Sequence, residues 1–371
     1  MTGDTLLAMS ITATPAAPAP AASPGLSGFT ALLDVIMSHE KAAYVRAAAE
    51  LRIADALAGG PLTSTELAAR MGFDEPALTR FLRACAVADL VREEETGRFT
   101  LTATGALLRS DSPMHAAMVS FAGPRMNRMY EQIGETVRSG EAATKVALGE
   151  DFLDYFENIS MRADEGVMFG KALAFLAATC GRRIASRFGV AKYPRIVDVG
   201  GGHGALLSAM LAGAPQSTGV LVDIPEVIER AREYVATQPA AGRVEFAPGN
   251  FFESVPAGGD LYTIKSVLLD WDDEHAARIL SSIAAAAKPG TPLLVIDWHY
   301  PADPTRDLAE GNLFASRMRL IDFWLLLTAG GKVRSEAQFR GMLAAAGFTV
   351  DGVSRVDTGP VSWDVIEARR A

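Results

Sequence analysis

Residues 195–223 read R-I-V-D-V-G-G-G-H-G-A-L-L-S-A-M-L-A-G-A-P-Q-S-T-G-V-L-V-D, and this stretch decides the fold of the chain. Residues 196–199 are rich in valine and isoleucine and are followed by glycine, which predicts a buried strand. The glycines allow a tight turn that residues with side chains could not make. An apolar helix over 206–211 and a second strand over 219–222 complete a strand–turn–helix–strand unit.

This unit predicts a nucleotide or nucleoside site at the turn. Gly200, Gly202 and Ala205 satisfy the pattern G-x-G-x-x-G/A. Asp223 ends the second strand about 20 residues further on, where an acid can accept hydrogen bonds from ribose hydroxyls. Free N–H groups at the start of the helix would face the ligand. Asp198 lies inside the first strand and suits a cationic amino-acid head better than a pyrophosphate. The alternative is a tight turn that binds nothing.

The composition limits the classes of protein to which the chain could belong. Its 371 residues are enough for about two domains, and 49% of them are hydrophobic. Cys85 and Cys180 give neither a disulfide framework nor a metal-ligand spacing, which predicts a reducing, cytoplasmic location. The net charge of −9 argues against a nucleic-acid or anionic-membrane surface. No apolar run in the sequence has the length of a membrane span.

Residues 1–27 are rich in alanine, proline, threonine and serine, and we expect them to form a disordered leader. Residues 28–110 carry the pattern of a winged helix. Apolar residues at three- and four-residue spacing predict an amphipathic helix over 42–58. Ser64 and Asp74 are expected to cap two further helices, and a hairpin around the Thr-Gly pair at 96–97 would form the wing.

A winged helix raises the possibility of DNA binding. The wing, however, carries Glu93, Glu94 and Glu95, which phosphates would repel. We therefore expect residues 28–110 to form a dimerisation domain. Residues 111–190 look mostly helical and are rich in methionine and aromatic residues. Most of these side chains are expected in the core, and a few could line a pocket for a flat aromatic ligand, because methionine adapts its shape. This segment is predicted to be a helical linker that contributes to a substrate pocket.

Strands and helices alternate through the rest of the chain. Strands are expected over 243–246, 261–268 and 292–298, helices over 274–287, 317–327 and 335–346, and a closing hairpin over 349–356 and 361–368. The alternation predicts an α/β fold, with a doubly wound sheet and a C-terminal antiparallel hairpin. Ligands of such sheets bind over the carboxyl ends of the strands. The loops at these ends would gather residues 200–204, 223, 250–251, 265–270 and 297–299 around one crevice.

From residue 29 onward the chain resembles one family. The winged-helix start is followed by V-D-V-G-G-G-H-G, L-V-D-I-P, G-N-F-F, K-S-V-L-L-D-W-D-D-E, K-P-G, G-G-K-V-R-S and A-A-G-F. This ordered set is similar to that of the S-adenosylmethionine-dependent small-molecule O-methyltransferases, which include plant caffeic acid enzymes and bacterial antibiotic-tailoring enzymes. The resemblance implies a Rossmann-like class I methyltransferase domain over 191–371 and a homodimer formed through the N-terminal domain.

The resemblance also implies the cofactor, S-adenosyl-L-methionine, and its contacts. Asp223 would hold the ribose, and Phe251 and Trp271 would flank the adenine. Asn250 stands where the family usually has Asp, and its amide can still bond an adenine edge. The expected cofactor-binding residues are Asp198, Gly200, Gly202, Asp223, Asn250, Phe251, Lys265, Ser266 and Trp271.

The catalytic positions depart from the family pattern. The family's general base is a His directly before Asp-Trp, and Leu269, which cannot take a proton, occupies that position. The acid that orients this His in the family is replaced by Val333, and the family's remaining acid corresponds to Asp297. Losing the base and its orienting acid together indicates a coordinated change rather than an accidental one.

Two explanations stay open. Holding the reactants in line can supply about 7–11 kcal/mol of the barrier, and a phenol of pKa about 10 that neighbouring carbonyls acidify barely needs a base. Alternatively, the base has moved. Residues two apart in a strand share a face, so Asp297 and His299 are expected to point the same way, with Asp297 orienting His299 as the general base.

We expect a methyltransferase that O-methylates a hydroxyl of an aromatic or polyketide-like natural product by proximity and orientation. The expected substrate-binding residues are Phe169, Leu269, Asp322 and Leu326. One alternative is a repurposed scaffold that keeps the cofactor but catalyses a hydroxylation, a decarboxylation or a pericyclic step. Others are a C- or N-methyltransferase, a winged-helix regulator and a nicotinamide dehydrogenase.

Overall fold

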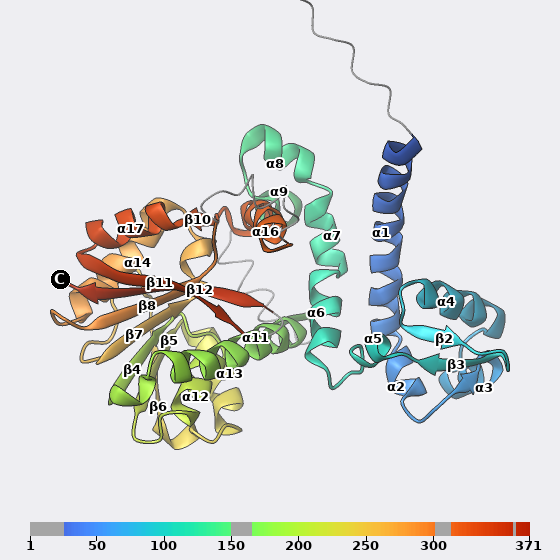
Figure 1. Cartoon of the computed structure of the whole chain (residues 1–371), viewed down its shortest axis with the longest axis horizontal. Coiled ribbons are helices and arrows are strands. Elements are labelled where there is room, and N and C mark those ends of the chain that lie inside the picture. Colours follow the sequence, from blue (N-terminus) through green and yellow to red (C-terminus); the bar gives the residue numbers. More distant parts are fainter. Residues whose placement is uncertain (1–25, 150–164, 301–312, 359–360) are drawn as a thin grey trace, which may run out of the picture.

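The computed structural model describes residues 26–149, 165–300, 313–358 and 361–371, without the side chains of residues 26–27, 165–169 and 313–316. The predicted leader, residues 1–27, lies almost wholly outside the described residues. Figure 1 shows an N-terminal unit on one side of the molecule and an α/β unit on the other. Helices α6 (Pro113–Phe121) and α7 (Pro124–Tyr130) run between the two. None of the described helices combines the length and the apolar character that crossing a membrane requires.

The N-terminal unit combines helices with a small antiparallel sheet in the order β1-β3-β2. Its elements are α1 (Leu26–Glu50), α2 (Ile53–Leu57), β1 (Leu62–Thr63), α3 (Ser64–Met71), α4 (Glu75–Val87), β2 (Val91–Glu93), β3 (Arg98–Leu101) and α5 (Ala103–Ala106). The predicted wing hairpin is therefore confirmed as β2 and β3. Asp74 caps α4 as predicted, since its carboxylate accepts a bond from the Ala77 N–H at 2.9 Å.

Two local expectations for this unit are wrong. The helix predicted over 42–58 is broken, because α1 ends at Glu50 and Arg52 adopts a left-handed conformation with φ of 55° before α2 begins. The spacing of apolar residues does not reveal this break, because the buried residues of α2 pack in the same core as those at the end of α1. The cap of α3 is Thr63 and not Ser64. The Thr63 side chain accepts from the Glu66 N–H and the Glu66 side chain bonds back, which is a capping box.

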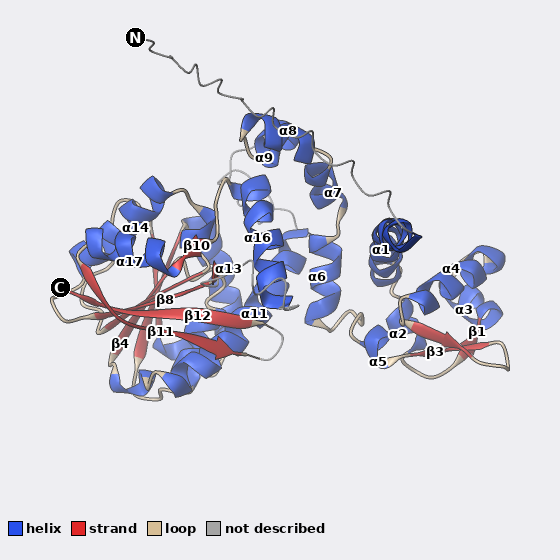
Figure 2. Ribbon diagram, turned by 45° about the horizontal axis from the view of Figure 1, so that its top comes forward, coloured by secondary structure: helices blue, strands red, loops and turns tan. Residues whose placement is uncertain are grey.

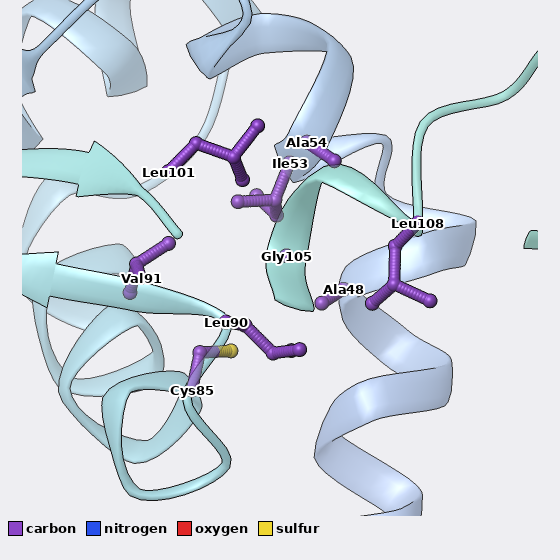
Figure 3. Close-up of a pocket in the computed structure, with 9 residues that line it drawn as sticks. All are labelled: Ala48, Ile53, Ala54, Cys85, Leu90, Val91, Leu101, Gly105 and Leu108. Atoms are coloured by element: carbon purple, nitrogen blue, oxygen red, sulfur yellow. The ribbon is translucent and has the colours of Figure 1, made fainter. Parts of the chain in front are cut away.

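A small cavity lies in the core of the N-terminal unit (Figure 3). Its lining is apolar and comes from the helices and strands of this unit: Ala48, Ile53, Ala54, Cys85, Leu90, Val91, Leu101, Gly105 and Leu108. The cavity measures about 10 Å³, which is barely the space of one water molecule. It is a packing gap and not a ligand site.

A second helical layer joins the two units. After α6 and α7 come α8 (Ile133–Ser139), α9 (Ala143–Leu148) and, beyond the undescribed residues 150–164, α11 (Glu165–Arg187). The helix α16 (Leu313–Ala329) returns to this layer from the C-terminal half, and Leu327 packs with Met126, Met129 and Ala143. The prediction that 111–190 is mostly helical is confirmed for the described residues.

The α/β unit is built on a seven-stranded sheet in the order β11-β12-β8-β7-β4-β5-β6. Its strands are β4 (Arg195–Val199), β5 (Thr218–Asp223), β6 (Val244–Pro248), β7 (Leu261–Lys265), β8 (Pro292–Asp297), β11 (Phe348–Asp357) and β12 (Ser362–Arg370). The first five pair in parallel, and β12 pairs antiparallel with both β8 and β11. The predicted doubly wound sheet with a closing hairpin is confirmed.

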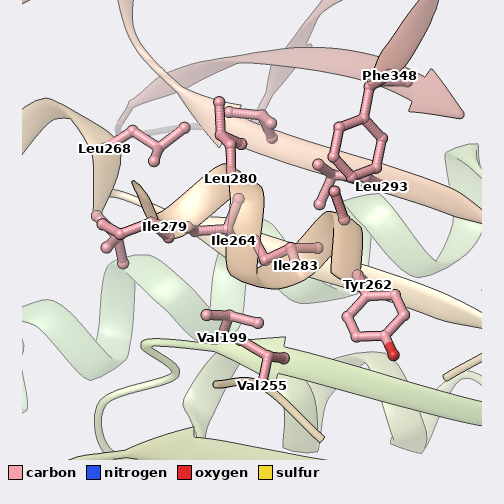
Figure 4. Packing of buried hydrophobic residues seen from close by; sticks show 14 of the residues in the cluster. Val199, Val255, Tyr262, Ile264, Leu268, Ile279, Leu280, Ile283, Leu293 and Phe348 are labelled. Atoms are coloured by element: carbon pink, nitrogen blue, oxygen red, sulfur yellow. The ribbon is translucent and has the colours of Figure 1, made fainter. Parts of the chain in front are cut away.

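Helices cover both faces of this sheet (Figure 2). One face packs against α11, α12 (Ala205–Ala212) and α13 (Pro225–Ala236), and the other against α14 (Asp273–Ala286) and α17 (Glu336–Ala345). Figure 4 shows this second core, where Ile279, Leu280 and Ile283 of α14 lie on sheet residues such as Ile264 and Leu293. Short 3₁₀ turns complete the unit: η1 (Val190–Lys192), η2 (Ala241–Arg243) and η3 (Leu268–Asp270).

Two strands end earlier than predicted. The strand expected over 261–268 stops at Lys265, because Ser266 has φ of 52° and the chain then enters η3. The strand expected over 292–298 stops at Asp297. The chain continues into β9 (His299–Tyr300), which forms a separate parallel pair with β10 (Arg334–Ser335). These early ends place several polar side chains at the carboxyl edge of the sheet.

Candidate active site

The glycine turn lies between β4 and α12 at the carboxyl edge of the sheet. Gly200 and Gly202 have φ of 65° and 56°, in the left-handed region that favours glycine. A Cβ on Gly200 would stand 2.6 Å from Val267. One on Gly201 would stand 2.1 Å from Leu221, so side chains are excluded at both positions. At Gly202, apart from its chain neighbours, no atom of the described residues lies within 4 Å of a Cβ position, so the turn is open there.

Asp223 ends β5 beside this turn. Its Oδ2 accepts from the Gly202 N–H at 2.8 Å, and its Oδ1 accepts from the Ile224 N–H at 2.9 Å. Burial raises the pKa of Asp223 to about 6, although these two N–H groups act in the opposite direction. The carboxylate is thus fixed next to the glycine turn, at the place expected of an acid that holds a sugar.

Asp198 is fully buried in β4. Its Oδ1 accepts from the Thr263 hydroxyl at 2.7 Å, while its Oδ2 has no hydrogen-bond partner among the described residues. Burial raises the pKa of Asp198 to about 7, against the opposing effects of the Thr263 bond and the Lys265 charge. A buried carboxylate oxygen without a partner is costly. The site therefore fits a ligand that brings a cationic group.

Lys265 ends β7 on the same face of the sheet. Its Nζ lies 3.7 Å from the centroid of the Trp363 ring and 3.0 Å from the Ser266 hydroxyl. Trp298 stacks on Trp363, with ring centroids 4.6 Å apart. Burial lowers the pKa of Lys265, while nearby acids such as Asp198 and Asp297 raise it. The positive φ of Ser266 places backbone strain beside this lysine, a feature that clusters at functional sites.

Four rings form an aromatic cluster next to the glycine turn: Phe251, Phe252, Trp271 and His275. Trp271 meets Phe252 edge to face at 4.7 Å between centroids, and it stacks on His275 at 5.6 Å. Phe251 and Trp271 are 6.4 Å apart with their planes at 83°. Asn250 is exposed nearby, and its Oδ1 accepts from the Phe252 N–H at 2.9 Å. The predicted pair of adenine-flanking rings thus belongs to one cluster, and the contact with adenine stays a prediction.

Leu269 and Val333, the two positions expected to depart from the family pattern, pack in one apolar cluster. Both are 4% exposed, and the fully buried Leu325 of α16 completes the cluster. Partly buried aromatic side chains, including Trp298, Tyr300 and Trp324, lie against it. A proton acceptor is absent from these two positions, and an apolar surface stands in its place.

Asp297 ends β8 at the carboxyl edge of the sheet, and the next residue, Trp298, packs against this apolar cluster. Asp297 is 3% exposed, and its Oδ1 accepts from the Trp298 N–H at 2.8 Å. Its Oδ2 lacks a hydrogen-bond partner within the described part of the chain. Burial raises the pKa of Asp297 to about 7, although the Trp298 N–H, the charges of Lys265 and Arg334, and the Leu269 N–H oppose this. Asp270 behaves similarly, since burial and the Asp297 charge raise its pKa. The edge therefore holds two buried carboxyl groups, Asp297 and Asp270, whose pKa values lie above the ordinary range.

The expectation that Asp297 orients His299 is wrong. The two residues do not share a strand, because β8 ends at Asp297 and His299 belongs to β9. His299 lies instead beside Asp364 of β12. Asp364 Oδ2 accepts from the main-chain N–H of His299 at 3.2 Å and lies 3.3 Å from the ring Nδ1, which makes no hydrogen bond to the described residues. Burial lowers the pKa of His299, while Asp364 raises it and Arg355 lowers it. A base at His299 would thus rely on Asp364.

The residues predicted to bind the substrate differ in their surroundings. Asp322 is engaged already, since its Oδ1 accepts from the Val333 N–H at 2.7 Å and its carboxylate bonds the Tyr300 hydroxyl. Leu326 is half-buried on α16, one residue from Leu325 of the apolar cluster. The side chain of Phe169, in α11, lies outside the described residues. Substrate contact stays a prediction for each of them.

Sequence reasoning missed Arg334 and Asp364. Arg334 is fully buried and donates to the Leu268 and Trp271 carbonyls at 2.6 and 2.7 Å. Arg334 is the arginine of the sequence G-G-K-V-R-S, in which only the valine, Val333, was expected to matter for function. Asp364 meets His299 across 65 residues of chain, and only the pairing of β12 with β8 brings them together.

The site has two halves with different chemistry. The glycine turn with Asp198 and Asp223 fits a ligand that carries both a cationic amine and a ribose, as S-adenosylmethionine does. The apolar cluster beside Asp297 fits a flat apolar ring whose polar group faces a carboxylate. Together these halves can hold a methyl donor next to an aromatic acceptor.

Comparison with known proteins finds two matches to family models. The model of an O-methyltransferase domain matches residues 130–349, and that of an O-methyltransferase dimerisation domain matches residues 33–111. The chain is 36% identical to mitomycin biosynthesis 6-O-methyltransferase of Streptomyces lavendulae, over 91% of this chain and 93% of that protein. It is 35% identical to 8-amino-8-demethylriboflavin N,N-dimethyltransferase of Streptomyces davaonensis, over 89% and 92%. The solved structure of mitomycin 7-O-methyltransferase superposes with a TM-score of 0.82 at 34% identity, covering 93% and 98%.

Proposed function

The chain belongs to the S-adenosylmethionine-dependent O-methyltransferase family, and on that premise we propose that it methylates a hydroxyl group of an aromatic or polyketide-like natural product. The observation that carries the mechanism is the packing of Leu269 and Val333 in one buried apolar cluster. The names of the similar mitomycin enzymes support the substrate class. The expected aromatic pocket, with Phe169, Leu269, Asp322 and Leu326, belongs to the same proposal.

S-adenosylmethionine, when bound, supplies the methyl group as an electrophilic sulfonium. We assign its amino group to Asp198, whose free carboxylate oxygen needs a cationic partner. Asp223 accepts the ribose hydroxyls, and the aromatic cluster forms the wall for the adenine. The full set proposed to hold the cofactor is Asp198, Gly200, Gly202, Asp223, Asn250, Phe251, Lys265, Ser266 and Trp271.

On the substrate side, the chain holds the hydroxyl oxygen in line with the methyl group. An oxygen–carbon bond forms, the carbon–sulfur bond breaks with its electron pair going to sulfur, and the hydroxyl proton leaves. Leu269 cannot take that proton. The acceptors that we propose are Asp297 or solvent. His299, whose ring Nδ1 lies 3.3 Å from Asp364, is the relocated base to be tested beside them. Acidic phenols are therefore the favoured substrates.

Mass spectrometry of incubations with S-adenosylmethionine and phenols of graded pKa tests this proposal. We expect products heavier by one methyl, release of S-adenosylhomocysteine, and faster transfer as the pKa of the phenol falls below about 10. Full activity in both Asp297→Asn and His299→Ala would support proximity alone. A large loss in one variant, with cofactor affinity intact, identifies the proton acceptor. Tight cofactor binding without transfer to any phenol would contradict the proposal.

A second candidate is N-methylation, which the similarity to the N,N-dimethyltransferase favours. Aromatic amines in the same panel distinguish it, since they would gain a methyl where the matching phenols do not. A substrate that changes without gaining a methyl, while the cofactor stays unconsumed, would instead indicate a repurposed scaffold.

We also propose that the protein is a homodimer joined through the domain that matches the dimerisation model, and that it acts in the cytoplasm. The exposed apolar face of α1 supports the first part, since Phe29, Leu32, Val35 and Ile36 are each at least 60% exposed. The cytoplasmic location rests on the two buried, unpaired cysteines.

A further inference from the structure

Residues 331–334, here called the clasp, close over the η3 loop at residues 268–271. A Cβ on Gly331 would stand 2.1 Å from the Leu269 carbonyl oxygen, so only glycine allows this approach. The Lys332 N–H donates to that same carbonyl at 2.9 Å. The Val333 N–H donates to Asp322 of α16 at 2.7 Å. The clasp therefore ties the loop to the helix that borders the proposed substrate pocket.

Arg334 is the buried end of the clasp. Its Nη1 donates to the Leu268 carbonyl at 2.6 Å, and its Nη2 donates to the Trp271 carbonyl at 2.7 Å. Its Nε donates to Asp273 Oδ1 at 2.9 Å, and Lys332 Nζ reaches the other oxygen of Asp273 at 2.6 Å. The side chain of Arg334 is 0% exposed. One planar guanidinium thus fixes both ends of the loop, a geometry that lysine cannot reproduce.

The loop that Arg334 fixes carries residues from both halves of the site. Trp271 belongs to the aromatic cluster, and Leu269 belongs to the apolar cluster. Arg334 also acts by its charge, which lowers the pKa of Asp297. The other charged groups that act on Asp297 come from neighbouring elements: Lys265 at the end of β7 and Asp270 in the loop itself. Asp364, opposite Asp297 on β12, is held by Arg355 and His299.

We propose that Arg334 is a positioning residue: it holds the loop at residues 268–271 so that the proposed cofactor contact Trp271 and the proposed substrate contact Leu269 keep fixed positions relative to each other. The inference rests on the proposed function, since it takes Trp271 as a cofactor contact and Leu269 as a substrate contact. It goes beyond that function because Arg334 itself reaches neither ligand. Its effect passes through the main-chain carbonyls of Leu268 and Trp271.

Two substitutions separate the parts of this role. Arg334→Lys keeps the positive charge but loses the planar guanidinium that bonds two carbonyls at once, whereas Arg334→Met loses both. The matched control is Arg243→Met. Arg243 also spans main-chain carbonyls, with bonds to Leu211, Ala214 and Ser217 at 2.8, 2.9 and 2.6 Å. It directly precedes β6, at the amino edge of the sheet and away from the site. The measurements are cofactor affinity by calorimetry, the melting temperature, and the pH profile of kcat/KM with one phenol.

Both Arg334 variants should bind S-adenosylmethionine about 10- to 100-fold more weakly, because the loop that carries Trp271 loses hydrogen bonds from a charged donor and the cofactor must then order that loop. Only Arg334→Met should move the acidic limb of kcat/KM to higher pH, since the lysine keeps its charge near Asp297. Arg243→Met should lower the melting temperature without either change. Affinity and pH profile equal to wild type in a folded Arg334→Met protein would overturn the proposal. So would equal affinity losses in Arg243→Met, because these would mark a purely structural role.

The experiment also separates this inference from the proposed function. Calorimetry measures cofactor binding whether or not any methyl group is transferred. If wild type binds S-adenosylmethionine but methylates no phenol, the proposed function fails, while the comparison of affinities still decides the role of Arg334. If transfer is observed and the affinities do not differ, the inference about Arg334 fails alone.

Discussion

At the scale of single residues, the site is built from buried carboxyl groups that the protein alone leaves incompletely satisfied. Asp198 and Asp297 each have one oxygen with no hydrogen bond from the described residues. Burial holds the pKa of each at about 7. A site of this kind is costly in the empty protein and gains from a cationic ligand.

Asp198→Asn should make the cofactor-free protein more stable at pH 8 and weaken its affinity for S-adenosylmethionine at least tenfold. The pKa of Asp198 rises on folding from 3.8 to about 7, so the native state binds more protons than the unfolded state between those values. Stability therefore falls as the pH rises from about 4 to 7. The variant should melt a few degrees above wild type at pH 8 and equal it near pH 4. Equal melting temperatures at pH 8 would contradict the raised pKa.

Arg52→Gly should stabilise the protein by about 1 kcal/mol. Arg52 has φ of 55°, a conformation that costs a residue with a side chain about 1–2 kcal/mol and costs glycine little. Urea unfolding measures the difference. Arg46→Gly, inside α1, is the matched control and should destabilise by about 1 kcal/mol because the helix disfavours glycine. A loss of stability in both variants would show that the strain is absent.

At the scale of elements, α11 lies directly on the glycine turn. A Cβ on Gly170 of α11 would stand 2.5 Å from the His203 ring, so this glycine lets the helix reach the turn. Gly170→Ala should displace His203 and weaken cofactor binding severalfold, and adding His203→Ala should restore it. Calorimetric titration checks both variants. Gly341→Ala in α17 is the control, since no described atom lies within 4 Å of its Cβ position. Failure of the double variant to recover affinity would rule out this contact as the cause.

Most elements could be predicted from the sequence because their signals are local. The glycines after residue 199 predicted the turn, and the apolar residues of 279–283 predicted the inner face of α14. What failed depends on distant contacts or on a single torsion angle. Asp364 reaches His299 only through the order of the strands, and β9 pairs with β10 across an undescribed segment. The left-handed Arg52 has no signal in hydrophobic periodicity.

The candidate site divides in the same way. Its cofactor half follows a contiguous motif, so Asp198, the glycines and Asp223 could be placed from the sequence, and the structure brings them together. Its acceptor half is assembled from β8, η3, β10 and α16, so neither the partner of His299 nor the engagement of Asp322 could be inferred. The roles of all these residues stay predictions.

At the scale of the whole molecule, α1 stands at the edge of the N-terminal unit with an exposed apolar face (Figure 1). Leu32 and Ile36 lie one turn apart on this face and are 69% and 60% exposed. The double substitution Leu32→Glu with Ile36→Glu should convert a homodimer into monomers, as measured by light scattering during gel filtration. Val87→Glu on α4, at a position 67% exposed, should leave the mass unchanged. Wild-type mass in the double variant would contradict a dimer formed through α1. The domain boundaries predicted at residues 110 and 190 stay predictions.

The hydrogen bonds of Arg334 to the main chain bear on which substitutions the loop can accept during evolution. Arg334 holds main-chain carbonyls, and a carbonyl is the same whatever side chain its residue carries. Other side chains can therefore occupy position 269 while the path of the loop, and with it the position of Trp271, the proposed adenine contact, stays fixed. Substrate range can then drift by single substitutions without loss of the methyl donor. The side chain of Arg334 must therefore be kept, whereas the side chain at position 269 can change.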